Sequence, residues 1–258
     1  MRGIASRDEI IDFLDELLDA RAFEDYGPNG LQVPGAAEVT TVATGVSAHL
    51  ELFEQAAAAG AQMVLCHHGL LWFKQPIVVD EQRKARLKAL FDADMSLAAY
   101  HLPLDAHGEH GNNALICAAL GLEQAEPFAA HSGRTIGWVG RARDGESIAR
   151  AELIERCRGA FGGREPLVFE HGPDEVRSVG VISGGAAGSL AEAADLGLDA
   201  FITGEPSEPG MADARERAIT FIAGGHYATE TFGVKRLGEL VAERFGVEHR
   251  FIEVPNPV

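Results

Sequence analysis

Apolar residues recur along the chain at two alternating spacings, which predicts helices and strands in alternation. Within residues 7–20, Ile10, Leu14 and Leu17 follow helical spacing, whereas AQMVLC (61–66) is a short apolar run typical of a buried strand. Strands are predicted near 39–46, 61–66, 95–100, 135–141, 166–170, 176–183, 199–203, 219–223 and 248–253, helices near 7–20, 48–59, 81–93, 112–121, 147–160, 187–196, 208–217 and 227–245, and a Gly/Pro/Asn-rich loop at 26–32. Alternating strands and helices imply βαβ units and a mainly parallel sheet, so the predicted fold class is α/β.

The same order of strand, helix, glycine turn and strand occurs twice in the sequence. The segment that begins at Val39 aligns without gaps with the segment that begins at Val176, and this places His68 over Glu205. The next strand also repeats, as MSLAAYHLPLD and TFIAGGHYATE, with His101 over His226 and Asp105 over Glu230. We therefore predict two similar α/β halves, residues 1–125 and 126–258, whose strand ends face one shared site. A pseudo-twofold axis is one way in which the two halves could be related.

Composition narrows the classes of function. The 258 residues include 39 acidic and 22 basic side chains, a formal net charge of −17. This balance argues against a general nucleic-acid partner, because such proteins carry a basic surface that releases counterions. No apolar run approaches the roughly 18 residues that span a bilayer, and the charged start MRGIASRDEI is unlike a signal peptide. We expect a cytoplasmic protein with no membrane partner.

The sequence contains three cysteines, Cys66, Cys117 and Cys157, with no CxxC motif. This sparse, odd number predicts reduced thiols. Cys66 precedes His67 and could act as a metal thiolate, but its place in an apolar strand favours a buried packing role.

Two pairs of polar residues follow predicted strands in the first half. His67 and His68 directly follow the strand at 61–66, and two adjacent side chains at a strand end point in different directions, so they could serve two metals. His101 and Asp105 lie on either side of Pro103, which predicts a loop rather than a helical pair.

The matching pair in the second half has a different predicted geometry. His226 and Glu230 follow Gly225 in a helical pattern, where a four-residue step puts both side chains on one face. Imidazole and carboxylate ligands suit Zn, Mn or Fe(II) and a site that activates water. The complete set of candidate metal ligands is His67, His68, Asp105, His226 and Glu230.

The glycine-rich segment SGGAAG (183–188) follows a strand and opens a helix. It could hold a phosphate at a helix N-terminus, but its spacing matches neither common phosphate-binding motif. Tight packing is the favoured interpretation.

Several motifs together resemble one known family. They are Asn29-Gly-Leu-Gln-Val33, Cys66-His-His-Gly-Leu-Leu-Trp72, Tyr100-His-Leu-Pro-Leu-Asp105, Gly111-Asn-Asn113, Thr203-Gly-Glu205 and Gly225-His-Tyr-Ala-Thr-Glu230. The chain resembles the NGG-one-interacting-factor-three-like family, often labelled GTP cyclohydrolase I type 2 or dinuclear metal-centre hexameric protein, in its compact bacterial branch without an inserted middle domain.

This resemblance implies a fold, an assembly and a set of metal ligands. It implies two related α/β domains around a dinuclear metal cleft, in a toroidal homohexamer with two divalent metal ions (Zn, Fe or Mn) per subunit. One metal would be held by His68, Asp105 and Glu230. The other would be held by His67, His226 and Glu230. His101 matches a nearby histidine of the family, and Glu205 stands where many relatives have Asp.

Three functions are weighed from these observations. The first is a metal-dependent hydrolase that acts on a nucleotide or a related phosphorylated heterocycle, with GTP ring opening as one version and His101 or Glu205 as candidate catalytic residues that move protons. The second is a non-enzymatic metal-binding ring with a regulatory or partner-binding role. The third, a DNA-binding ring, is opposed by the net charge of −17.

Overall fold

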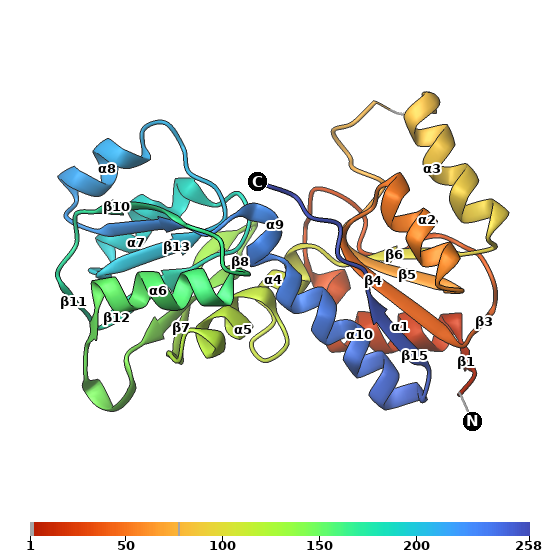
Figure 1. Ribbon diagram of the computed structural model, residues 1–258, viewed down its shortest axis with the longest axis horizontal. Helices are drawn as coiled ribbons and strands as arrows, with labels where there is room; N and C mark the ends of the chain where they lie inside the picture. Colours follow the sequence, from red (N-terminus) through yellow and green to blue (C-terminus); the bar gives the residue numbers. More distant parts are fainter. Residues whose placement is uncertain (1–2, 77) are drawn as a thin grey trace. The chain divides into compact units, whose positions relative to one another are not determined.

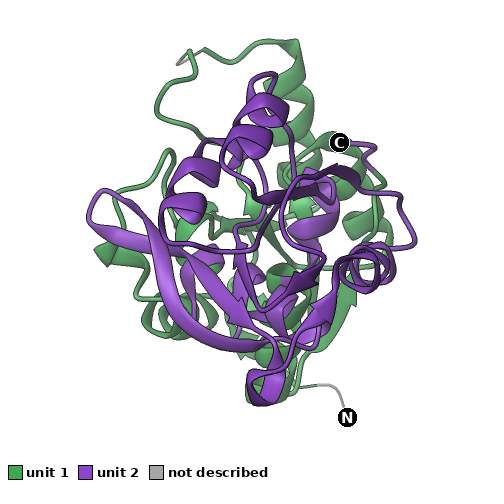
Figure 2. Cartoon of the chain, turned by 90° about the vertical axis from the view of Figure 1, so that its left-hand side faces the viewer, with its two compact units in different colours: residues 1–104, 233–255 green, residues 105–232, 256–258 purple. Residues whose placement is uncertain are grey.

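The computed structural model describes residues 3–76 and 78–258, which pack into two compact units (Figure 1, Figure 2). Unit 1 comprises residues 1–104 and 233–255, and unit 2 comprises residues 105–232 and 256–258. The chain leaves unit 1 after Leu104 and returns to it at Gly233. The predicted halves, which meet at residue 125, rest on the sequence repeat rather than on packing, and they stay a prediction.

Unit 1 is built on one sheet of five strands, in the order β15-β4-β5-β6-β2. Their bounds are Glu248–Phe251 for β15, Thr41–Ser47 for β4, Met63–His68 for β5, Ser96–Ala99 for β6 and Gly30–Val33 for β2. The first four are parallel, and β2 joins β6 antiparallel. Strand β2 falls partly on the predicted loop, because a short edge strand that starts at Gly30 carries almost no apolar signal.

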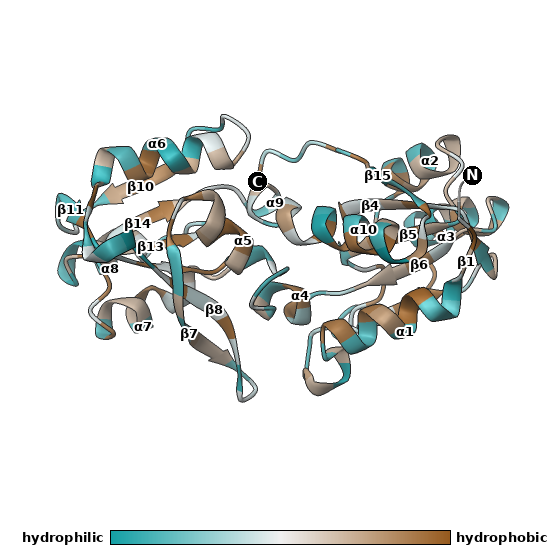
Figure 3. Cartoon of the chain, turned by 90° about the horizontal axis from the view of Figure 1, so that it is seen from below, coloured by the Kyte–Doolittle hydropathy of each residue, from teal (hydrophilic) through white to brown (hydrophobic). Residues whose placement is uncertain are grey.

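Helices cover both faces of this sheet. In Figure 1, α2 (Leu50–Ala58) and α3 (Glu81–Asp92) lie on one side, and α1 (Arg7–Leu17) and α10 (Thr231–Phe245) lie on the other. Figure 3 shows the brown apolar patches of α1 separated by teal polar ones, as its helical spacing requires. Leu52 and Phe53 of α2 are buried against alternate residues of the strands, such as Val64 and Leu97.

Unit 2 is built on a mixed sheet of six strands, in the order β10-β14-β13-β12-β8-β7. The bounds are Leu167–Glu170 for β10, Thr220–Ala223 for β14, Ala200–Thr203 for β13, Ser178–Val181 for β12, Arg134–Arg141 for β8 and Glu123–His131 for β7. Strands β12, β13 and β14 are parallel, while the other pairings are antiparallel. The α/β class is confirmed, but the expectation of a mainly parallel sheet holds only in unit 1.

The sequence prediction missed the edge strand β7. It carries Pro127 at the end of five exposed residues, and proline is tolerated in a sheet only at an edge. Its hairpin to β8 turns through Ser132 and Gly133, which both have positive φ, as a tight two-residue hairpin requires.

Helices also cover both faces of the unit 2 sheet. One face packs against α5 (Asn112–Ala119) and α6 (Arg150–Ala160), and the other against α7 (Leu190–Asp195) and α8 (Gly210–Glu216) (Figure 3). Phe201 stands between Phe128 and Phe221, with ring centroids 6.3 and 6.0 Å apart. These aromatic contacts fix the strands whose ends carry the candidate site.

Two local predictions near the site need correction. The segment after His101 is the short helix α4 (Leu102–Ala106) and not a loop, because Pro103 lies in its first turn, where no backbone N–H is needed. The predicted helix 227–245 is divided at Glu230 into α9 (His226–Thr229) and α10. The Thr229 hydroxyl bonds the Gly225 and His226 carbonyls and so competes with the helical ladder there.

The repeated sequence segments fold into the same order of parallel strands. Strands β4, β5 and β6 of unit 1 correspond to β12, β13 and β14 of unit 2.

Among the described residues, no helix is both long and apolar enough to cross a bilayer.

Candidate metal centre

Three histidine rings gather at the carboxyl ends of β5 and β6 in unit 1. His67 and His68 end β5, and His101 follows β6. The ring centroid of His67 lies 4.7 Å from that of His68 and 4.9 Å from that of His101. One ligand atom from each residue falls within 4.8 Å of the others, so this group could hold a metal ion.

His67 is held in the form that a metal requires. It is fully buried, and its Nδ1 lies 3.1 Å from the carbonyl oxygen of Tyr100. Because a carbonyl only accepts, Nδ1 must carry the proton, and the lone pair of the neutral ring is then on Nε2. This arrangement is common for histidine ligands, whose second nitrogen is usually tied to an acceptor.

The other two rings are also tied through Nδ1. The Nδ1 of His68 lies 3.1 Å from the hydroxyl of Ser47, at the end of β4. The Nδ1 of His101 lies 2.7 Å from Oδ1 of Asp25, whose side chain is 2% exposed. Burial alone would raise the pKa of Asp25, but hydrogen bonds from His101 and other donors bring that pKa below its ordinary value.

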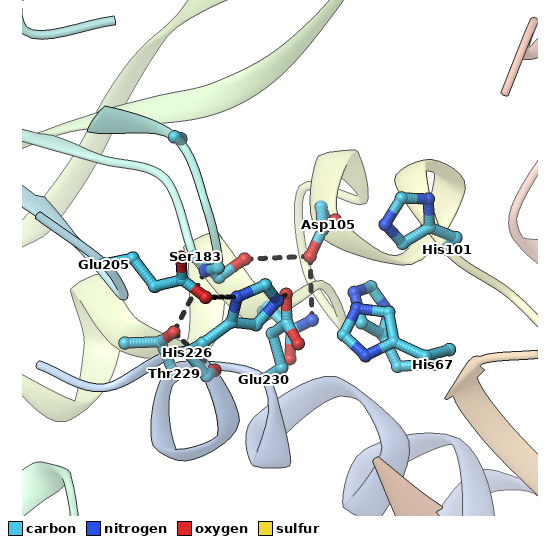
Figure 4. A network of polar contacts seen from close by, with 12 residues as sticks. His67, His101, Asp105, Ser183, Glu205, His226, Thr229 and Glu230 are labelled. Atoms are coloured by element: carbon cyan, nitrogen blue, oxygen red, sulfur yellow. Dashed lines mark hydrogen bonds and ion pairs between the residues drawn. The ribbon is translucent and has the colours of Figure 1, made fainter. Parts of the chain in front are cut away.

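Unit 2 brings a histidine and two glutamates together at its own strand ends (Figure 4). His226 follows β14, and its Nε2 lies 3.0 Å from Oε1 of the buried Glu230, four residues later. Its Nδ1 lies 2.5 Å from Oε1 of Glu205, which follows β13. The predicted contact between His226 and Glu230 is present, but Glu230 follows the end of α9 instead of lying within one continuous helix.

The two carboxylates determine the charge of His226. Burial by itself would lower the pKa of this imidazole. The hydrogen bonds and negative charges of Glu230 and Glu205 outweigh burial and raise the pKa of His226 to about 9. At neutral pH a proton therefore joins these three side chains, and a divalent cation could take the place of that proton.

Asp105 lies in unit 2 and is held by two neutral donors. Its Oδ1 accepts a hydrogen bond of 2.8 Å from Asn112 Nδ2 and another of 2.8 Å from the Ser183 hydroxyl (Figure 4). Ser183 is fixed in turn, because its backbone N–H donates to Asn113 Oδ1 at 2.7 Å. Two neutral donors on one oxygen leave the carboxylate of Asp105 an acceptor, as a ligand of a divalent cation must be.

Two glycines of unit 2 allow these side chains to approach the backbone. Gly184 has φ +65°, and an added Cβ would meet Oε1 of Glu230 at 2.2 Å. An added Cβ on Gly204 would lie 2.6 Å from Cα of His226. Gly184 belongs to the SGGAAG segment, so close packing against Glu230 is the role that the structure gives that segment.

Of the predicted residues, His67 and His68 end β5, His101, Glu205 and His226 follow strands, Asp105 lies in α4, and Glu230 follows α9. Asp105 contacts Asn112 and Ser183. Unit 1 brings His67, His68 and His101 together, and unit 2 brings Glu205, His226 and Glu230 together. The donor set is nitrogen and carboxylate oxygen, as Zn, Mn or Fe(II) requires. Cys66 is not part of it. Burial raises the pKa of its thiol, and its side chain belongs to the unit 1 core.

Sequence reasoning did not name Asp25 or Ser47, and it gave Asn112 and Ser183 no part in orienting these side chains. Asp25 is 76 positions from His101, so no local spacing could connect them. A signal did exist for Asn112 and Asn113, because two adjacent fully buried amides in an apolar helix require specific partners.

Comparison with known proteins decides the family. A family model described as Duf34/NIF3 (NGG1p interacting factor 3) matches residues 5–257. The chain belongs to the NIF3 family. The resemblance inferred from the motifs is therefore confirmed.

Relatives in the NIF3 family match this chain over nearly its whole length. A protein from Pseudomonas aeruginosa named GTP cyclohydrolase 1 type 2 homolog is 42% identical over 248 residues, which cover 96% of this chain and 97% of the relative. A protein of the same name from Escherichia coli is 38% identical over 253 residues, which cover 96% of this chain and 98% of the relative.

Solved structures share the NIF3 fold with this chain. A structure described as protein ybgI of unknown function has a TM-score of 0.92 and 36% identity, and the match covers 98% of this chain and 100% of that one. Protein TTHA1606 from Thermus thermophilus has a TM-score of 0.87 and 33% identity with the same coverage.

Proposed function

We propose that this protein is a metal-dependent hydrolase that acts on a nucleotide or a related phosphorylated heterocycle. The observation that carries the proposal is the group of three histidines in unit 1, whose ligand atoms lie within 4.8 Å of one another. In this proposal His67 and His68 are metal ligands, and His101 stands beside them as the residue that moves protons. His67 supports it further, because its Nδ1 is bonded to a carbonyl and its Nε2 is in the ligand form. A divalent cation bound there would supply Lewis acidity and would lower the pKa of water to near neutrality.

The proposal includes two divalent ions per subunit. One would be held by His68, Asp105 and Glu230, and the other by His67, His226 and Glu230. These sets come from the family resemblance. They are supported by the burial of both carboxylates, since a buried carboxylate is stable only when a cation or strong donors compensate it.

The remaining polar residues are assigned to orientation and proton transfer. Glu205 bonds Nδ1 of His226, so it would direct Nε2 of that ring toward the cation. His101 has its Nδ1 on Asp25, so its Nε2 would take up or release a proton during hydrolysis. Of the two candidate catalytic residues, we therefore assign proton transfer to His101 and positioning to Glu205.

An arginine next to the ligand helix supports a phosphorylated substrate. Arg164 packs against Gly225, since an added Cβ on that glycine would meet its Nη1 at 2.6 Å. Gly225 directly precedes His226, so the guanidinium supplies a positive charge beside a candidate metal ligand in a strongly acidic protein. The shared name of the curated relatives makes GTP the first nucleotide to test.

The test is turnover by protein loaded separately with Zn, Mn or Fe(II) against a panel of nucleotides and simple phosphoesters. We expect hydrolysis with at least one metal, abolished by chelation and strongly reduced in His68→Ala. The matched control is His171→Ala, which removes an imidazole outside both clusters. Arg164→Gln should raise KM for phosphorylated substrates and leave metal content unchanged.

A complete lack of turnover with two metals bound per chain would contradict the hydrolase and favour the alternative, a non-enzymatic metal-binding ring. We further propose, from the family resemblance alone, that the protein forms a homohexamer. A stable monomer by light scattering at micromolar concentration would contradict that assembly.

A further inference from the structure

Asp25 collects four hydrogen bonds although its side chain is almost completely buried. Its Oδ1 accepts from His101 Nδ1 at 2.7 Å and from the Tyr26 backbone N–H at 2.6 Å. Its Oδ2 accepts from Asn29 Nδ2 at 3.0 Å and from the Leu102 backbone N–H at 2.9 Å. Both oxygens are therefore fully engaged, which compensates the burial of the charge.

One of these bonds decides which nitrogen of His101 carries the proton. An ionised carboxylate only accepts hydrogen bonds, so Nδ1 of His101 must donate to Asp25. The lone pair of the neutral ring is then on Nε2. The ring lies 4.9 Å from His67 and 5.5 Å from His68, measured between centroids, and it meets Trp72 edge-on at 5.2 Å.

The other bonds fix the position of the ring. Leu102 is the first residue of α4, so Asp25 satisfies a backbone N–H that the helix itself leaves without an intrahelical acceptor. The backbone N–H of His101 donates to Oδ1 of Asn29 at 2.8 Å. The segment from Asp25 to Asn29 therefore holds His101 by its ring and by its backbone.

We propose that Asp25 is the positioning residue of His101, holding the imidazole in the Nδ1–H tautomer so that Nε2 presents a lone pair to the histidine group. This deepens the proposed function and rests on it for the catalytic consequence. The tautomer itself does not depend on the substrate. Whether Nε2 takes a proton or a cation, it can do so only from this tautomer.

The variant Asp25→Asn tests whether Asp25 sets the tautomer of His101 or only stabilises the loop that contains it. The amide keeps the shape of Asp25, but only its oxygen can accept, so one of the two pairs of donors loses its acceptor. When the amide nitrogen faces His101, it donates to Nδ1, and the proton of the ring moves to Nε2. Glu24→Gln is the matched control, because it removes the same charge from the exposed neighbouring residue.

The first measurement is the 15N spectrum of histidine-labelled full-length protein by magic-angle-spinning NMR, at about pH 8.5 to keep ordinary imidazoles neutral. His101→Gln assigns the signal. We expect the Nδ1–H tautomer in the unaltered protein and in Glu24→Gln, and a shift toward the Nε2–H tautomer in Asp25→Asn. An Nε2–H tautomer in the unaltered protein overturns the proposal even if Asp25→Asn fails to fold.

The second measurement is turnover of whichever substrate the nucleotide panel identifies. We expect kcat of Asp25→Asn to fall on the order of 10²-fold, with metal content and KM little changed. An unchanged kcat together with a changed tautomer would overturn the catalytic part of the role. If the unaltered protein turns over nothing, the hydrolase proposal fails, while the NMR result still decides whether Asp25 sets the tautomer.

Discussion

The two units use one scaffold to present two kinds of chemistry. In unit 1, the strands β4, β5 and β6 end in Ser47, His68 and the segment that carries His101. In unit 2, the matching strands β12, β13 and β14 lead into Ser183, Glu205 and His226. Unit 1 therefore supplies three imidazoles, whereas unit 2 supplies two carboxylates around one imidazole, and these raise its pKa to about 9.

The difference shows how a repeat can diverge at its strand ends and keep its core. Cores tolerate only apolar residues of similar volume, so the strands stay alike. Residues beyond the carboxyl ends do not pack in the core, and they can change chemistry without loss of the fold. One feature is common to both units: a carboxylate bonds Nδ1 of the histidine that follows the third parallel strand. Asp25 bonds His101 after β6, and Glu205 bonds His226 after β14.

The largest expected effect comes from Glu230→Gln. As the proposed shared ligand, Glu230 supplies a negative charge and two oxygens, whereas an amide offers one neutral oxygen. We expect Glu230→Gln to lower the occupancy of both metals, while His67→Ala or His68→Ala each mainly empties one. Elemental analysis of the three purified variants measures this. Two metals retained per chain in Glu230→Gln would show that Glu230 does not bridge.

Two glycines of unit 2 allow the cost of backbone strain to be measured apart from the cost of crowding at the site. Gly184 and Gly197 have φ of +65° and +72°, but an added Cβ meets Glu230 at the first and nothing within 4 Å at the second. Gly197→Ala should cost roughly 1–2 kcal/mol of the free energy of unfolding. Gly184→Ala should cost a further amount of roughly 1–3 kcal/mol. Denaturant titration measures both costs, and equal costs would contradict the crowding.

The histidines of the two units predict opposite pH dependence for the metal-free protein. In unit 1, burial lowers the pKa of His49 and of His249 below the ordinary value of 6.5. Below pH 6.5 the unfolded chain therefore binds more protons than the folded chain, and the free energy of unfolding decreases as the pH falls. In unit 2, the pKa of His226 is raised from 6.5 to about 9, so its contribution is complete below pH 6.5 and is lost as the pH rises to about 9.

Each unit contains one of the two tryptophans, Trp72 in unit 1 and Trp138 in unit 2. Urea unfolding followed by fluorescence in Trp138→Phe and in Trp72→Phe therefore reports on each unit in turn. A free energy of unfolding that does not change between about pH 5 and pH 9 in both variants would contradict the assignment of these shifts.

The smallest effect concerns the cysteines, which should behave alike in both units. Burial raises the pKa of Cys117 and of Cys157 to about 12, and that of Cys66 above its usual range. All three are free and buried in the structure. We expect almost no reaction with a thiol reagent in the native protein and three thiols after denaturation without reductant. Fewer than three would reveal a disulfide.

The sequence predicts long periodic elements and strand-end histidines well, because both depend on local spacing. His67, His68 and His226 could be found in this way. The edge strands β2 and β7 could not, because β2 has only four residues and the first five residues of β7 are exposed, so both depend on pairing with a neighbouring strand. The partners of the site residues were also hidden, since Asp25 and His101 are joined only by tertiary contact.

The points at which the chain passes between the units have a consequence for gene architecture. Asp105 is the first residue of unit 2, and Glu230 stands three positions before the return at Gly233. A gene fission that separated the units at these positions would create a new chain end within a few residues of a candidate ligand. Evolution by splitting or shuffling the two units is thereby disfavoured, whereas an insertion at the Ser132-Gly133 hairpin would leave every candidate ligand in its native sequence surroundings.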